Sequence, residues 1–103
     1  MTRARLPNRR ASESFEFQCG SHCYIATISL YPGTDQLAEI FLGNGRAGSE
    51  LDAAAKDSAV VASIALQYGI PVDVIRHALL RDPRGVAASP LGVALDLLAR
   101  EQT

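Results

Sequence analysis

The sequence predicts an α+β domain: a three-stranded antiparallel meander followed by three helices that pack on one face, in two layers. A length of 103 residues with 48% hydrophobic side chains suits one compact domain and excludes a large multi-domain enzyme. Apolar residues recur with period two up to about residue 42 and with period 3.6 after residue 48. Strands that all precede the helices favour α+β.

Residues 1–12 are predicted to form a basic flexible arm, and residues 13–103 a single domain. The arm contains four of the nine arginines and Pro7, and it has no apolar periodicity. Ten basic and eleven acidic side chains give a net charge of −1, which divides into +4 for the arm and −5 for the rest. The domain itself should therefore repel phosphate, so any contact with nucleic acid would involve the arm.

Alternation predicts the strands. Phe15 and Phe17 alternate with polar residues, Gly20-Ser21 makes a two-residue turn, and residues 24–30 alternate again. Pro32-Gly33 suits the centre of a type II turn, and a third strand is expected over residues 37–42. The second face of this sheet should carry a semi-apolar row, namely Cys23, Ile25, Thr27, Ser29 and Tyr31.

Capping residues predict the helices. Ser49 is expected to begin a helix that runs to about Tyr68, with Asp52 at the capping-box position, and Gly69 ends it. Pro71 begins a second helix to about Arg81, and Ser89-Pro90 precedes a third over residues 91–101. The first helix has a narrow polar stripe, so it should be buried on more than one side; the stripe consists of Asp52, Lys56, Ser63 and Gln67.

These faces predict association between chains. A small sheet with a partly apolar exposed face invites contact, and an alanine-rich helix allows close approach by a neighbour. We expect another copy or another protein to cover the sheet face or the helix, and a homodimer or homo-oligomer to form.

Residues 43–48 fit the pattern G-x-G-x-x-G between a strand and a helix. The same pattern forms the phosphate-binding loop of dinucleotide-binding folds. Those folds also need a second parallel strand and an acidic residue about 20 positions further on, whereas here one long helix follows. Glu50 and Asp52 would repel a pyrophosphate, although Arg46 could offset part of this. Turn chemistry is the favoured interpretation, and an anion site is the alternative.

Cys19, His22 and Cys23 place three metal-capable side chains within five residues. In the predicted hairpin Cys19 and His22 share one face and Cys23 points to the other, so neither a strain-free disulfide nor a shared chelate is expected. A fourth ligand would have to be the distant His77, because structural zinc takes four ligands. We interpret these side chains as ordinary hairpin residues with reduced thiols.

Ala65, Gly69 and Ile75 have the spacing of a helix-turn-helix, whose second helix would present Arg76, His77 and Arg81. Asp73 lies where base contacts would concentrate, and the domain is acidic. A plain helical hairpin is therefore favoured.

Five stretches across nearly the whole chain are recognisable together: residues 6–13, 37–42, 47–49, 65–71 and 90–97. In them the chain resembles a stand-alone member of the TSCPD domain family. That domain is found near the C-terminus of adenosylcobalamin-dependent ribonucleotide reductases and also as small separate proteins. The Thr-Ser-Cys-Pro-Asp string that names the family is absent, and no cysteine follows Cys23. The redox role of the reductases' C-terminal cysteines is therefore not carried over.

The resemblance implies a TSCPD-like domain over residues 13–103 that serves as an accessory or regulatory domain of ribonucleotide reductase. Radical chemistry needs a barrel that about 100 residues cannot form. An enzyme name, if one applied, would be adenosylcobalamin-dependent ribonucleoside-diphosphate reductase, with adenosylcobalamin bound only in the associated reductase. Resemblance and loop chemistry together suggest the contact residues: Arg9, Arg10, Glu39, Asn44, Arg46 and Ser49.

Two other functions are weighed. One is a nucleic-acid or nucleotide-binding module that uses the arginine arm and the Gly43–Gly48 loop. The other is an oxidoreductase through Cys19 and Cys23. The sequence does not indicate a catalytic set of nucleophile, base and orienting group. No stretch approaches the roughly 20 apolar residues of a membrane span. A cytoplasmic location without membrane contact is expected.

Overall fold

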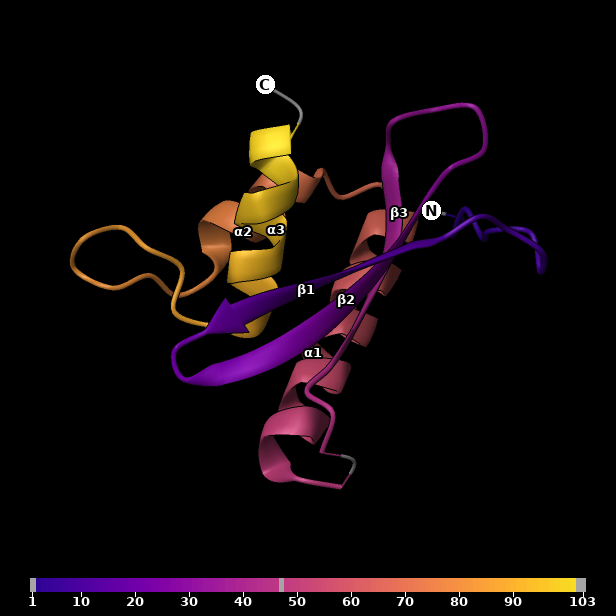
Figure 1. Cartoon of the computed structure of the whole chain (residues 1–103). Coiled ribbons are helices and arrows are strands. Elements are labelled where there is room, and N and C mark those ends of the chain that lie inside the picture. The colour runs from indigo at the N-terminus through magenta and orange to yellow at the C-terminus, as the bar shows by residue number, and fades with distance from the viewer. Residues whose placement is uncertain (1, 47, 102–103) are drawn as a thin grey trace.

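The computed structural model of the protein describes residues 2–46 and 48–101. Three strands come first, β1 (Glu13–Cys19), β2 (His22–Leu30) and β3 (Leu37–Gly43). Three helices follow, α1 (Glu50–Gln67), α2 (Val72–Ala78) and α3 (Pro90–Glu101). In Figure 1 the strands cross in front of the helices, so the sheet and the helices form two layers. The α+β fold expected from the sequence is confirmed.

The sheet is an antiparallel meander in the order β1-β2-β3. Phe17 of β1 lies opposite Tyr24 of β2, and their rings stack with centroids 5.8 Å apart. The Gly20-Ser21 turn is confirmed, and Gly20 has a φ of +61°. At the second turn the Thr34 N–H donates to the Tyr31 carbonyl at 3.0 Å. This bond closes a four-residue turn with Pro32 and Gly33 at its two central positions, as predicted.

Only one of the two hydrogen bonds of the predicted capping box forms at the start of α1. Ser49 Oγ accepts a hydrogen bond from the Asp52 N–H at 3.1 Å, as an N-cap does. The reciprocal bond of a capping box was expected from Asp52, but the Ser49 N–H donates to the Arg46 carbonyl. The Asp52 carboxylate instead accepts from the Asn44 N–H at 3.1 Å. It therefore ties the end of β3 to the first turn of α1.

α2 ends at Ala78, three residues before the predicted end at Arg81. The segment that follows folds back on itself, because Arg81 and Ala87 form an isolated antiparallel bridge and the Asp82 N–H donates to the Val86 carbonyl. Ser89 then caps α3 as expected, accepting from the Gly92 N–H at 3.3 Å. Among the described residues, no helix has both the length and the hydropathy needed to cross a membrane.

The core lies between the inner face of the sheet and the helices. Ile40 of β3 and Leu95 of α3 are its largest fully buried side chains. The rest of the core comes from every strand, from α1 and from α3, whereas α2 has no fully buried residue. α2 packs on the core through partly buried side chains such as Val72 and Ile75, and polar contacts add to this attachment.

The polar stripe of α1 lies against the free edge of β3. Ser63 Oγ accepts a hydrogen bond from the Ile40 N–H and donates one to the Ile40 carbonyl, both at 2.9 Å. Gln67 Nε2 donates to the Ala38 carbonyl at 3.1 Å. β3 is the last strand of the sheet, so these side chains satisfy backbone groups that a neighbouring strand would otherwise pair.

This orientation leaves the opposite, apolar side of α1 exposed, with Val60, Val61 and Ile64 at the surface. The expectation that α1 is buried on more than one side is therefore not met within this chain. Ser63 and Gln67 of the polar stripe are buried because the sheet edge offers them hydrogen-bond partners, whereas Lys56 stays exposed. Alanines at positions 55, 59 and 62 allow the close approach.

The second face of the sheet is only partly open. Cys23 and Ile25 are exposed on it, whereas Ser29 is buried. The N-terminal arm lies next to Ser29, since a shallow pocket of about 260 Å³ is lined by arm residues together with β2 and β3. The chain itself thus covers one end of the face that was expected to need a partner.

Candidate functional site

Arg10 and Glu39, two of the predicted contact residues, form an ion pair on the second face of the sheet. Arg10 Nε donates to Glu39 Oε1 at 2.5 Å, and Nη2 donates to Oε2 at 3.0 Å. Arg10 Nη1 also donates to the Pro7 carbonyl at 2.8 Å. The Glu39 side chain is almost wholly buried, so this bidentate pair compensates a carboxylate that would be costly to bury alone.

Further contacts hold the start of the arm. The Ala4 N–H donates to the Gln67 carbonyl at 2.7 Å, and Tyr31 Oη donates to the Ala4 carbonyl at 2.6 Å. Arg3 Nε donates to Gln67 Oε1 at 2.7 Å. These hydrogen bonds attach the start of the arm to the end of α1. The flexibility of the remaining arm residues stays a prediction. Arg9, another predicted contact residue, is exposed.

Asn44, Arg46 and Ser49 form a second cluster beyond the end of β3. Asn44 Oδ1 accepts a hydrogen bond from the Arg46 N–H at 3.0 Å, which closes a tight turn. The Arg46 side chain is exposed at the rim of this turn. The structure thus brings Arg10 to Glu39, whereas Asn44 follows Glu39 by five residues, about 16 Å along an extended strand.

The glycine-rich loop presents an acidic group where a phosphate would bind. The Asp52 carboxylate lies at the start of α1, 2.8 Å from Lys56 Nζ. The Lys56 ammonium and the Asn44 N–H lower the pKa of Asp52 below its usual range. A carboxylate there already interacts favourably with the helix dipole. The geometry therefore favours turn chemistry for residues 43–48, and nucleotide binding stays a prediction.

Asp96 on α3 anchors a cluster that the sequence did not indicate as a unit. It accepts hydrogen bonds from Arg76 Nε at 2.8 Å and from Arg81 Nη1 and Nη2 at 2.8 and 2.9 Å. Arg76 and Arg81 were the candidate DNA-contacting residues of the helix-turn-helix alternative. Their guanidinium groups instead join α2 and the following loop to α3, which supports the plain helical hairpin. In the sequence, the one feature that could have indicated this cluster was the acidic residue Asp96 in an amphipathic helix.

The Asp96 cluster predicts a pH dependence of stability. Hydrogen bonds from Arg81 and then Arg76 hold the pKa of the Asp96 carboxyl well below its usual range, although burial opposes them. In the unfolded chain the carboxyl has an ordinary pKa near 3.9, so acid protonates the unfolded state first. The contribution of Asp96 should be complete above about pH 5 and decrease as the pH falls below about 4.

In Asp96→Asn the free energy of unfolding should therefore decrease less steeply than in the wild type as the pH falls. Urea unfolding followed by circular dichroism between about pH 5 and pH 2 measures the slope. Asp52 and Asp82, whose pKa values are also lowered, titrate in both proteins and serve as an internal reference. Equal slopes for the wild type and Asp96→Asn would contradict the assignment.

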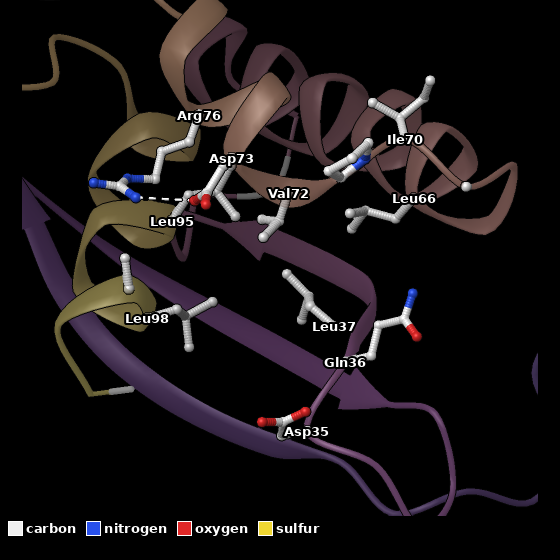
Figure 2. A pocket seen from close by; sticks show the side chains of 13 residues that line it. Asp35, Gln36, Leu37, Leu66, Ile70, Val72, Asp73, Arg76, Leu95 and Leu98 are labelled. Atoms are coloured by element: carbon white, nitrogen blue, oxygen red, sulfur yellow. Dashed lines mark hydrogen bonds and ion pairs between the residues drawn. The ribbon is translucent and has the colours of Figure 1, made fainter. Parts of the chain in front are cut away.

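A leucine cleft of about 390 Å³ opens where β3, α1, α2 and α3 meet. Leu37, Leu66, Leu95 and Leu98 line its interior, as Figure 2 shows. Asp35 lies at one end of the cleft, and Asp73 with Arg76 at the other. No local sequence pattern indicates this cleft, because it combines residues from four separated segments.

The cysteines lie as the hairpin predicted. Cys19 pairs in register with His22, and Cys23 pairs with Gln18, so the two thiols point to opposite faces. Both are free, and burial raises the pKa of the Cys19 thiol. Among residues 2–46 and 48–101, no group of three or more metal-capable side chains is assembled.

A small α+β domain with an arginine–glutamate pair on one face of its sheet and a leucine cleft between sheet and helices is the class of protein that this geometry defines. No protein-family model matches the chain, and no solved structure matches it. Curated relatives exist among vitamin B12-dependent ribonucleotide reductases. The enzyme of Rhodopirellula baltica is 33% identical over 73 residues, which are 71% of this chain and 7% of the reductase. The enzymes of Streptantibioticus cattleyicolor and Streptomyces clavuligerus are each 32% identical over 91 residues, 85% of this chain and 15% and 9% of theirs.

The chain is therefore related in sequence to a small part of these reductases, and it spans between 7% and 15% of their length. This agrees with the relation expected from the resemblance. Membership of the TSCPD family itself stays a prediction.

The described residues do not fit a cobalamin. A corrinoid with its nucleotide tail is much larger than a molecule that the 390 Å³ cleft could enclose. His22 and His77, the two histidines, are exposed and do not line this cleft. No step of chemistry through this cofactor is assigned to the chain.

Proposed function

We propose that the chain is an accessory or regulatory domain of ribonucleotide reduction that docks on a vitamin B12-dependent reductase and is not catalytic alone. One observation carries the proposal: the sequence similarity covers most of this chain but a small fraction of each reductase. The chain thus corresponds to one part of a longer enzyme. Surfaces that such a part uses within the enzyme are suited to contact the same enzyme from outside.

The arm and the second face of the sheet form the proposed docking surface. Arg10 is fixed by Glu39, exposed Arg9 precedes it, and Phe41 of β3 is half exposed nearby. Arginine and aromatic side chains dominate the binding energy of protein interfaces. Arg46 at the far end of β3 extends this surface. The partner should present carboxylates to these arginines, while adenosylcobalamin stays with the reductase.

Arg9→Glu should weaken the complex with the reductase at least tenfold, because it reverses an exposed charge at the proposed contact. The measurement is biolayer interferometry with the chain immobilised and the intact reductase of the same cell in solution. Arg9 can be changed without breaking the Arg10–Glu39 pair, so the fold should be kept.

Arg84→Glu is the matched control. It makes the same charge change on an exposed arginine in the loop between α2 and α3, and it should alter the dissociation constant less than twofold. No complex at about 10 µM reductase would refute the proposed function. Equal weakening by both variants would refute the assigned surface.

A further inference from the structure

α1 presents an apolar strip to solvent. The strip comprises Ala53, Ala54, Val60, Val61, Ile64 and Tyr68, which share the side of the helix opposite the sheet. Val61 at its centre is 67% exposed. Asp57 is the one charged residue in the middle of this side. An amphipathic helix normally exposes its polar side, and α1 does the reverse because its polar residues bind the edge of β3.

An apolar groove runs beside the strip, between α1 and α2. Its volume is about 540 Å³, and its lining includes Val61, Ala65, Val74, Ile75 and Leu91. The strip is a ridge and the groove is a depression on the same surface. A surface of this kind can pair with a copy of itself, as two-fold interfaces require.

We propose that the chain forms a two-fold dimer in which α1 of one copy packs antiparallel against α1 of a second copy. The two-fold axis passes between Val61 and Ile64, so that Val61 of each copy contacts Ile64 of the other. The protruding side chains of one copy then enter the groove of its mate.

The position of Asp57 selects this register. Pairing about the middle of α1 would bring the two Asp57 carboxylates next to each other in an apolar interface, which is unfavourable. Pairing about Val61 and Ile64 separates them by 11 residues, about 16 Å along the helix axis. Each Asp57 then lies opposite Tyr68 of the other copy, whose hydroxyl can donate a hydrogen bond to the carboxylate.

The exposed area agrees with a weak dimer. The exposed parts of these side chains amount to roughly 500 Å², near the upper limit of about 600 Å² for the largest apolar patch of a typical monomer. Two copies would bury about 1,000 Å², the minimum for a specific interface. A dissociation constant in the micromolar range is therefore expected. The proposed docking surface for the reductase lies on the second face of the sheet and stays accessible in this dimer.

Sedimentation velocity over about 5 to 500 µM chain tests the proposal. The wild type should shift from the monomer of 11.0 kDa to a dimer of about 22 kDa as the concentration rises. Val61→Arg should raise the dissociation constant at least tenfold. Val86→Arg is the matched control, since Val86 is a half-exposed valine in the loop between α2 and α3, and it should leave the dimer intact.

Circular dichroism of both variants confirms that each is folded before comparison. A wild-type chain that stays monomeric at 500 µM overturns the proposal, and so does a Val61→Arg variant that dimerises as well as the wild type. A monomeric wild type whose binding to the reductase is weakened by Val61→Arg would assign the strip to the reductase instead. The outcome is independent of the Arg9→Glu experiment, because the two variants lie on different surfaces.

Discussion

Asp96→Ala is expected to lower the free energy of unfolding by about 3 kcal/mol, the largest effect of any single change considered for this chain. The substitution leaves Arg76 and Arg81 without the carboxylate that accepts three of their hydrogen bonds. Both guanidinium side chains are 26% exposed, so water replaces these bonds only in part. Because of this partial exposure, the loss of stability stays below the loss expected from breaking a fully buried ion pair.

The effect should be strongest in α2. This helix has no fully buried residue, so the Arg76–Asp96 contact contributes a large share of its attachment to α3. Chemical denaturation gives the change in free energy, and hydrogen exchange should show α2 amides exchanging faster than those of α1. Uniform acceleration in all three helices would show that the network does not hold α2 specifically.

Asp73→Ala is the control for this network. Asp73 also pairs with Arg76, at 3.1 Å, but its side chain is 68% exposed. Its removal should cost less than about 1 kcal/mol, because exposed pairs are screened by water and the remaining term is a helix-dipole interaction. A loss equal to that of Asp96→Ala would contradict the assigned role of Asp96.

Ser63→Ala is expected to lower the free energy of unfolding by about 2 kcal/mol. Ser63 Oγ satisfies both the N–H and the carbonyl of Ile40, a fully buried residue at the edge of the sheet. Alanine fits the same space but leaves both backbone groups without these partners. Thermal and urea unfolding measure the loss, and faster exchange of the Ile40 amide locates it.

Ser58→Ala on the same helix is the matched control. Ser58 Oγ donates to the Ala55 carbonyl one turn earlier, a bond that supports no strand and competes with the helix backbone. Its removal should change stability by less than about 0.5 kcal/mol. Equal losses for the two serine variants would show that the hydrogen bonds of Ser63 to the β3 edge do not set the cost.

The candidate site was predictable only in part. Arg10 and Glu39 were both named from sequence, but their pairing across 29 positions became visible in the fold alone. The Asp96 cluster and the leucine cleft were not predicted, since each joins segments that no local pattern connects. Arg76 and Arg81 were candidates for a recognition helix in the alternative interpretation only, because sequence cannot show which acid a long side chain reaches.

Sequence by itself determined the order of strands and helices, both turns of the meander and the caps at Ser49 and Ser89. These features depend on residues within a few positions of each other, whose backbone preferences act locally. Tertiary structure alone decided which side of α1 faces the sheet. Periodicity separates polar from apolar residues, but it does not show which of them face solvent. The unpaired edge of β3 offers Ser63 and Gln67 hydrogen bonds that water would otherwise supply. These residues of the polar stripe therefore face inward, and the apolar side is left at the surface.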